Sequence, residues 1–335
     1  MRLHGLDAAR FLAYCGMVLV NFRIVAQAAP DGSMADQFVS LLEGRAAALF
    51  VVLAGVGLAL AAPARWLTAK RGLFLFLVGM VNMTIFEADI LHFYGIYFLL
   101  ILPVLGMRGQ RLLWLAGLVL LVSFAALLGL DYERGWNWET LSYADFWTLG
   151  GFLRHSLYNG WHPVLPWIAF LLLGLWVGGL ELAARSVQNR LILWGAVLAL
   201  AASWLSLEIQ RAEPELAEAL GLAPIPPSPL YVLAASGTAL LAIGALLRLS
   251  PVLERLGIAR WLVAPGRQSL SLYVAHILIG MGALEALGLL DGSLTNGGIL
   301  AIALGFCALS SLYAVFWRRR FSRGPLEALM RRITG

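Results

Sequence analysis

The sequence predicts an all-α fold, a polytopic integral membrane bundle of about ten transmembrane helices, and two observations support this prediction. First, 61% of the 335 residues are hydrophobic and only 13% are charged, whereas soluble domains are near half apolar and about a quarter charged. Second, the apolar residues fall into about ten runs, each close to the roughly 20 residues that cross a hydrocarbon core of about 30 Å. Little chain remains for a soluble part, so we expect one transmembrane domain over residues 1–335.

Hydropathy places the individual spans along the chain. We expect them at residues 6–24, 42–62, 72–86, 90–106, 112–130, 163–182, 191–207, 230–247, 269–289 and 298–317. The longest connection, residues 131–161, is rich in tryptophan and tyrosine, which prefer the headgroup layer of a membrane. This connection is therefore expected to be an interfacial outer segment with a helix over about 142–157. Cys15 and Cys307 lie inside apolar runs, so no disulfide is expected.

Lysine and arginine are distributed unevenly between the two sides of the expected bundle. We assign successive connections to alternate sides. Only five of the 24 lysine and arginine residues then fall on one side, namely Arg23, Arg45, Arg134, Arg154 and Arg211. Arg10 lies within the first span, and the others fall on the opposite side. The positive-inside rule makes the arginine-rich side cytoplasmic. Both termini are therefore expected in the cytoplasm, with the chain in a bacterial-type inner membrane. The charge lies in loops and not on one polar face, so no nucleic-acid partner is expected.

Asp89 and His92 are the clearest candidates for chemistry, because ionisable groups in or near membrane spans are costly and often functional. They are three residues apart in ADILHFYGIY, so in a helix the two side chains share a face. A carboxylate beside an imidazole orients a general base and stabilises its protonated form. A structural interpretation is equally open, in which Asp89 caps the helix and His92 forms a hydrogen bond within the bundle.

Further polar residues are expected near the outer ends of their spans, namely Asn21, Arg45 and His162. With Asp89 and His92 they would form a pocket that opens outward if their helices are neighbours. Structural roles compete here too, because amides join helices in membranes and Arg45 can pair with Glu43 or Asp89. His276 lies deepest, nine residues and so roughly 14 Å inside its helix from Arg267. Its structural interpretation is a hydrogen bond to a neighbouring helix. His4 and His155 are expected at the surface.

Six segments of the chain resemble, in order, the conserved blocks of the YeiB-like family of membrane proteins, a domain of unknown function within the transmembrane acyltransferase superfamily. They are LDAARFLAYCGMVLVNF, EGRAAALFVVLAGVGLAL, ADILHFYGIYFLL, GWHPVLPWIAFLLLGLWVGG, APGRQSLSLYVAH and RGPLEALMRR. The resemblance spans nearly the whole chain, and six blocks in the right order are specific. The superfamily includes lysosomal heparan-alpha-glucosaminide N-acetyltransferase.

The resemblance implies a bundle of about ten helices that moves an acyl group, above all acetyl, from cytoplasmic acyl-CoA to an acceptor across the membrane. Asn21 looks like the asparagine that closes the first conserved helix of the lysosomal enzyme, and Glu43 resembles its next conserved acidic residue. The catalytic histidine that follows that asparagine in the lysosomal enzyme has no counterpart here, because residues 23–42 contain no histidine. His92 would therefore take the role of the base.

The sequence thus favours an acyltransferase whose donor is acyl-CoA, above all acetyl-CoA, with no metal. The predicted catalytic residues are His92 and Asp89. The residues predicted to bind the acceptor are Asn21, Arg45, Tyr94 and His162. The residues predicted to bind the donor are Arg260, Arg267, Ser269 and His276. The two arginines would contact its phosphates. The acceptor is expected to be a small molecule, glycan or lipid that carries a hydroxyl or an amine.

Two other functions stay open on the sequence alone. A transporter or flippase for a small anion or lipid would line a route across the membrane with polar groups. No internal repeat is visible, however, and charge in the middle of the spans is scarce. A non-catalytic membrane partner protein is the third interpretation. The oligomeric state is undetermined, and contacts with membrane lipids are expected, because arginines at the ends of spans also bind anionic lipids.

Overall fold

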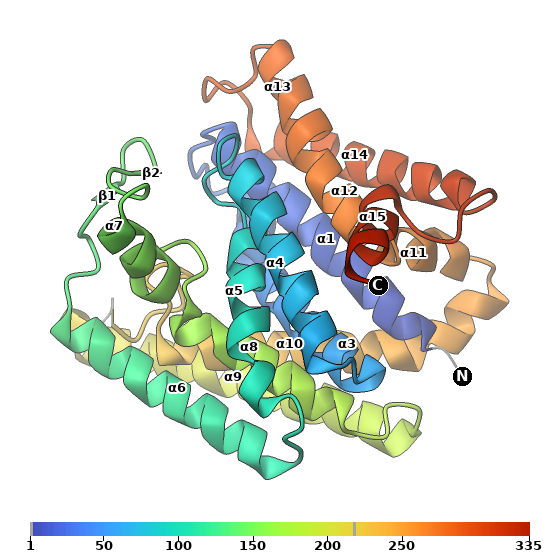
Figure 1. Cartoon of the computed structure of the whole chain (residues 1–335). Helices are drawn as coiled ribbons and strands as arrows, with labels where there is room; N and C mark the ends of the chain where they lie inside the picture. The colour runs from blue at the N-terminus through green and yellow to red at the C-terminus, as the bar shows by residue number, and fades with distance from the viewer. Residues whose placement is uncertain (1–2, 217–218) are drawn as a thin grey trace. The chain divides into compact units, whose positions relative to one another are not determined.

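The computed structural model describes residues 3–216 and 219–335, and the chain in these ranges is almost entirely helical (Figure 1). Arg2, which contributes to the charge asymmetry, lies outside the described residues. The α-helices are α1 (His4–Val25), α2 (Met34–Leu42), α3 (Arg45–Ala61), α4 (Arg65–Asn82), α5 (Leu91–Leu100), α6 (Gln110–Gly129), α7 (Leu149–Arg154), α8 (Val164–Gly178), α9 (Arg185–Ala212), α10 (Pro229–Arg255), α11 (Ala259–Gly266), α12 (Ser269–Ala275), α13 (Gly282–Ala286), α14 (Asn296–Trp317) and α15 (Pro325–Thr334).

Shorter elements complete the described part of the chain. The 3₁₀ turns are η1 (Leu102–Val104) and η3 (Pro214–Leu216), and the π-helical turns are η2 (His155–Asn159) and η4 (His276–Met281). Two short strands, β1 (Trp136–Asn137) and β2 (Ser142–Tyr143), pair antiparallel, with Trp136 opposite Tyr143. The all-α fold class is therefore confirmed for the residues that the structure describes.

Every expected span overlaps a helix, but the expected number of about ten transmembrane helices is not confirmed. Among the described residues, seven helices are long and apolar enough to cross a membrane, or up to eight if the pair formed by 149–159 and α8 counts as one span bent by 50°. The difference lies in α4, which begins with several basic residues, and in α5, which has only 10 residues. The chain is a multi-pass membrane protein with fewer full-length spans than the hydropathy pattern predicts.

The outward surfaces of α6 and α9 suit a hydrocarbon environment. Trp114 and Leu121 on α6 are 77% and 69% exposed, and Leu200 on α9 is 71% exposed. In water such rows of exposed apolar side chains would cause aggregation. In a bilayer they contact lipid tails, and the helical backbone satisfies its own hydrogen bonds.

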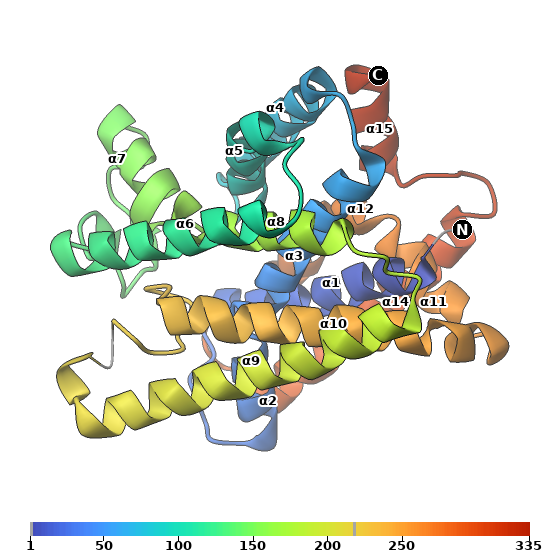
Figure 2. The ribbon, with the colours of Figure 1, turned by 90° about the horizontal axis from the view of Figure 1, so that it is seen from below.

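The helices form two compact units. Unit 1 comprises residues 1–50, 182–193 and 239–335, and unit 2 comprises residues 51–181 and 194–238. Within unit 1, α1 packs against α11, α12 and α14. Within unit 2, α4 lies beside α5 and α6 packs against α8 (Figure 1). The part of α10 that belongs to unit 2 runs along α9, where Gly237 faces the backbone of Ala199 (Figure 2).

Small residues allow the helices of unit 2 to approach closely, as is common in membranes. Gly55 on α3 and Gly174 on α8 face each other, and a Cβ at Gly55 would lie 2.3 Å from the carbonyl oxygen of Leu171. The same holds between α4 and α5, where a Cβ at Gly79 would lie 2.0 Å from the backbone nitrogen of His92. The position of His92 therefore depends on a glycine in the neighbouring helix.

The outer segment 131–161 is only partly helical, so the predicted helix over 142–157 is wrong in its first half. Residues 142–143 form β2, and the helix begins at Leu149 because the Thr148 side chain caps it, accepting a hydrogen bond from the backbone N–H of Gly151 at 3.0 Å. From His155 the helix widens into η2 and ends at Asn159. We call residues 131–161 the outer cap.

Replacing Gly55 by alanine should destabilise unit 2, because the new methyl group would meet the backbone of α8. Overpacking of this kind costs about 1–3 kcal/mol. Thermal unfolding of the detergent-purified protein would measure the loss. The matched control is Gly117→Ala on α6, where no atom lies within 4 Å of the position that the new Cβ would take. Equal unfolding temperatures for the two variants would contradict the close crossing of α3 and α8.

Candidate functional site

His92 lies in the first turn of α5 with its side chain fully buried, at 0% exposure. The chain enters α5 through the turn that follows α4, so the carboxylate of Asp89 reaches the start of the helix. Asp89 Oδ2 accepts hydrogen bonds from the backbone N–H of Leu91 at 2.7 Å and of His92 at 3.3 Å. Asp89 is therefore the cap of α5, as one of the two sequence interpretations predicts.

The same carboxylate also faces the imidazole ring. Asp89 Oδ2 lies 3.6 Å from His92 Nδ1, and Asp89 Oδ1 accepts a hydrogen bond from the buried amide of Asn82 at 3.1 Å. Asn82 is the last residue of α4, and sequence analysis missed it. Its only sequence signal is an amide in an otherwise apolar run. Capping and orientation of the ring are thus combined in one carboxylate that three donors hold in place.

Two further histidines surround His92, and together with Phe93 and Phe146 they form what we call the histidine cluster. The rings of His92 and His155 stack with centroids 5.9 Å apart, and the ring of Phe146 lies 6.1 Å from His92 and 5.0 Å from His155. The ring of Phe93 lies 5.4 Å from His155 and 5.8 Å from His162. The cluster is entirely within unit 2.

The prediction that His155 lies at the surface is wrong, because its side chain is only 1% exposed. The π-helical turn η2 turns it inward, against the rings of Phe93, Tyr143 and Phe146. A regular helix over the same residues would direct the side chain differently, and π-helical turns are often found at functional sites. The local sequence does not reveal such a turn.

The histidine cluster and the residues next to it contain buried polar atoms that lack a hydrogen-bond partner among the described residues. They are His92 Nδ1 and Nε2, His155 Nδ1, Ser156 Oγ, Trp161 Nε1, His162 Nδ1 and Trp167 Nε1. A buried donor or acceptor that stays unpaired costs about 1–3 kcal/mol. Such a concentration of unmet hydrogen bonds around one histidine is the arrangement expected of a site that binds a polar ligand.

The outer cap is held together by hydrogen bonds around Tyr143 and Asn159. The Tyr143 hydroxyl accepts a hydrogen bond from Arg154 Nε and donates one to Asn159 Oδ1, both at 2.7 Å. Arg154 also pairs with Asp145 at 2.6 Å, and the amide of Asn159 donates to the carbonyl of Tyr132 at 2.8 Å. This network orders the aromatic residues that cover His155.

Glu87 joins the turn before Asp89 to the outer cap. Its carboxylate accepts a hydrogen bond from the backbone N–H of Tyr143 at 3.3 Å. Burial raises the pKa of the Glu87 carboxyl above its usual range, and the hydrogen bond from Tyr143 partly offsets the shift. The outer cap therefore contacts the turn before Asp89 through Glu87, and it places the ring of His155 beside the ring of His92.

Tyr94 is buried, as a member of a binding site would be. Its ring lies 6.0 Å from that of Tyr97, whose hydroxyl donates a hydrogen bond to the backbone carbonyl of His162. The ring of His162 packs edge-on against Trp167 at 4.6 Å. The structure thus brings Asp89, His92 and His162 together in unit 2.

Asn21 and His276 form a second polar pair, in unit 1. Asn21 Nδ2 lies 3.0 Å from His276 Nε2, and His276 Nδ1 contacts the backbone carbonyl of Tyr273. Tyr14 packs edge-on against the imidazole at 6.3 Å. The structural interpretation of His276, a hydrogen bond to a neighbouring helix, is therefore confirmed. A single pocket that also contains Asn21 and His92 stays a prediction.

Within unit 1, the structural alternative that Arg45 pairs with Glu43 is wrong. Arg45 donates to the backbone carbonyl of Leu41 at 3.2 Å. Glu43 pairs instead with Arg23, which lies 3.2 Å away and also binds Asp36 at 2.8 Å. Arg23 is only 8% exposed and lies in the last turn of α1, so its charge needs both partners. Sequence analysis missed this pairing because the partners lie in a later helix.

The residues predicted to bind the donor lie in and beside α11 and α12. Arg260 is exposed, with its guanidinium 5.2 Å from the ring centroid of Trp261. Arg267 ends α11, and Ser269 begins α12. Among the described residues, no group of three or more histidine, cysteine, aspartate or glutamate side chains could hold a metal ion.

Replacing Tyr143 by phenylalanine should loosen the outer cap, because Arg154 and Asn159 would each lose a hydrogen-bond partner. A loss of about 1.4 kcal/mol corresponds to about tenfold faster amide exchange in a locally opening segment. Hydrogen exchange over residues 131–161 measures this change. Glu139→Ala, at the exposed tip of the hairpin, is the control and should leave exchange unchanged. Identical exchange in the two variants would show that the Tyr143 network does not hold the cap.

Two family models match the chain. The model described as heparan-alpha-glucosaminide N-acetyltransferase, catalytic, matches residues 2–207, which include α1 to α8 and the histidine cluster. The model described as protein of unknown function (DUF418) matches residues 179–335, which include α10 to α15. No curated protein matches the chain. The first match covers more than half of the sequence.

Proposed function

Because this chain belongs to the family of the heparan-alpha-glucosaminide N-acetyltransferase catalytic domain, we propose that it is a membrane acyltransferase that moves an acetyl group from acetyl-CoA to an amine or hydroxyl. The acceptor is a small molecule, glycan or lipid that reaches the site from the extracytoplasmic side. The donor enters from the arginine-rich side, which we assign to the cytoplasm together with both termini. A bacterial-type inner membrane fits this arrangement.

One observation carries the proposal: His92 is fully buried, and neither of its ring nitrogens has a hydrogen-bond partner among the described residues. Asp89 lies on the Nδ1 side of the ring at 3.6 Å. Nε2 is then available to a proton on the bound acceptor. A histidine base with an adjacent carboxylate is one arrangement that promotes acyl transfer to a hydroxyl or amine.

In the proposed reaction, the nitrogen or oxygen of the acceptor attacks the thioester carbonyl, and His92 takes the proton that this atom loses. The carbon–sulfur bond then breaks, the acetyl group stays on the acceptor, and the CoA thiolate takes the proton from the imidazolium. Asp89 stabilises the imidazolium and keeps the ring in place, while Asn82 and the backbone N–H groups hold Asp89. A positioned base of this kind contributes about 10²- to 10⁴-fold to the rate.

The remaining predicted residues supply binding. His162, a member of the histidine cluster, and Tyr94, in the same helix as His92, contact the acceptor. We assign Asn21 and Arg45 to the thioester oxygen or to an anionic group of the substrate. The donor is held by Arg260, Arg267, Ser269 and His276. Arg260 suits a CoA phosphate because it is exposed and forms no ion pair within the described residues.

Transfer can be tested in sealed proteoliposomes that contain the full chain, with glucosamine inside and acetyl-CoA outside. We expect release of CoA thiol outside and formation of N-acetylglucosamine inside. His92→Ala should lower kcat by at least about 100-fold, because the base is lost. His4→Ala is the matched control, since His4 forms only an exposed contact with Glu254 at 2.7 Å. A folded His92→Ala protein with wild-type turnover would contradict the mechanism.

Two measurements separate this proposal from its competitors. Acetyl-CoA should stabilise the purified protein against heat, by about 2.7 kcal/mol at 100 times its Kd, whereas ATP should not. This readout does not depend on the acceptor. Flux of glucosamine or of a small anion without acetyl-CoA would instead support a transporter. An absence of both stabilisation and flux would favour the non-catalytic partner protein.

A further inference from the structure

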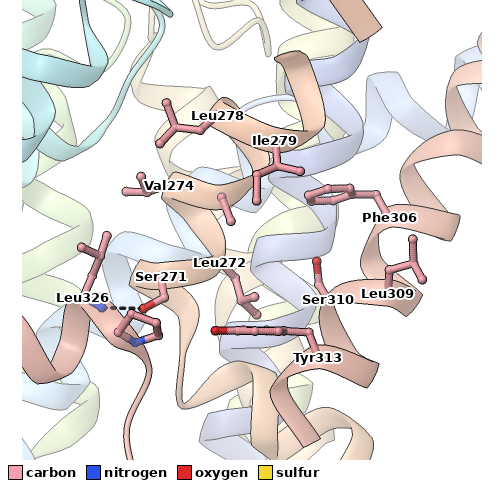
Figure 3. A pocket seen from close by; sticks show the side chains of 12 residues that line it. Ser271, Leu272, Val274, Leu278, Ile279, Phe306, Leu309, Ser310, Tyr313 and Leu326 are labelled. Carbon is pink, nitrogen blue, oxygen red and sulfur yellow. Dashed lines mark hydrogen bonds between the residues drawn. The ribbon is translucent and has the colours of Figure 1, made fainter. Parts of the chain in front are cut away.

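Unit 1 contains an apolar cavity, and none of the residues that line it is assigned to the proposed reaction. Its volume is about 510 Å³, within the range of small-molecule sites. α12 and η4 form one wall and α14 the other, and their side chains face each other across the cavity (Figure 3). The lining is almost entirely hydrocarbon and includes Leu272, Val274, Ile279, Phe306 and Leu309.

The open side of the cavity faces the layer that surrounds the helices, because three of the residues that line it are exposed. Leu278 is 52% exposed, and Ile279 and Leu309 are each 65% exposed. The segment from α12 to α13 and the helix α14 are both long and apolar enough to span a membrane. A ligand can therefore enter between them from the hydrocarbon layer.

One end of the cavity is closed by α15, which is anchored to the start of α12. Glu327 accepts hydrogen bonds from the backbone N–H of Leu270 at 2.9 Å and from the Ser271 hydroxyl. The Ser271 oxygen in turn accepts the backbone N–H of Leu326 at 2.9 Å (Figure 3). These bonds place Pro325 and Leu326 in the lining.

At the same end, a stack of aromatic rings leads from the cavity to a cluster of positive charge. The ring of Tyr313, which lines the cavity, lies 5.5 Å from Trp317, and Trp317 stacks on Phe321 at 4.3 Å. Tryptophan and tyrosine prefer the headgroup layer. The exposed arginines that follow form no ion pair within the described residues, and they are Arg318, Arg319, Arg320, Arg323, Arg331 and Arg332.

We propose that this cavity binds one acyl chain of an anionic membrane phospholipid, whose phosphate lies among the arginines of residues 318–323. The apolar lining matches the hydrocarbon chain, and the aromatic stack marks the depth at which the chain meets the headgroup. Juxtamembrane arginine clusters attract anionic lipid. α15 presents Leu329 and Ile333 as exposed apolar residues beside Arg331 and Arg332, so it lies along the membrane surface as an amphipathic helix.

A phospholipid fits this cavity better than a ligand from the aqueous phase. The open side consists of exposed leucine and isoleucine, so the route into the cavity runs through lipid. The polar end carries several arginines and Glu327, whose carboxylate already binds the start of α12. The site therefore offers positive charge only at the headgroup depth and hydrocarbon everywhere else.

Native mass spectrometry of the detergent-purified full chain can test the proposal by titration with dioleoyl phosphatidylglycerol. Leu309→Trp should fill the cavity and weaken binding of the first lipid by about tenfold or more. Leu312→Trp is the matched control, because Leu312 is exposed on the same helix but does not line the cavity. A triple change, Arg319→Gln with Arg320→Gln and Arg323→Gln, should weaken the same lipid about tenfold. Arg108→Gln with Arg111→Gln, before and at the start of α6, should not.

Each other outcome overturns the proposal in a recognisable way. Equal binding by Leu309→Trp and Leu312→Trp would show that the chain does not enter the cavity. If the wild-type protein bound dioleoyl phosphatidylcholine as tightly as dioleoyl phosphatidylglycerol, the arginines would have no role in binding the headgroup. Displacement by glycerol 1-phosphate would indicate a headgroup site alone, and displacement by palmitoyl-CoA at equal concentration would assign the cavity to a thioester. None of these results depends on His92.

Discussion

The contact between α4 and α5 at Gly79 is the constraint on which the proposed site depends. Only a glycine allows the backbone of α4 to lie against His92, and this contact holds the first turn of α5 at the end of α4. Asn82 and Asp89 can then meet at the turn between the two helices. An added methyl group at Gly79 would separate the helices and move the imidazole away from its carboxylate.

The second determinant is the cost of burying polar groups among hydrocarbon. Two carboxylates offset this cost for Arg23, and a hydrogen bond with His276 offsets it for Asn21. The histidine cluster does not, because several of its ring nitrogens are buried and unpaired within the described residues. The contrast supports a ligand role for the cluster and a structural role for Arg23.

Much of this architecture follows from local sequence. Hydropathy locates the helices, and the spacing of Asp89 and His92 predicts that the two side chains lie close together, as found, although Asp89 precedes α5 and does not share a helix face with His92. Hydropathy overestimates the number of full spans because it does not reveal that α5 stops after 10 residues. The position of His155 and the pairing of Arg23 could not be predicted, since the first depends on a π-helical turn and the second on contacts between distant segments.

The most direct test of the account is a double-mutant cycle on CoA release, with His92→Ala, Asp89→Asn and the combined variant. If the imidazole and the carboxylate act as one unit, the account predicts that the combined variant is no slower than His92→Ala, because Asp89 contributes only through His92. The proposed catalytic pair would be contradicted if the two effects multiplied. The combined variant would then be slower than His92→Ala by the full factor by which Asp89→Asn alone slows CoA release.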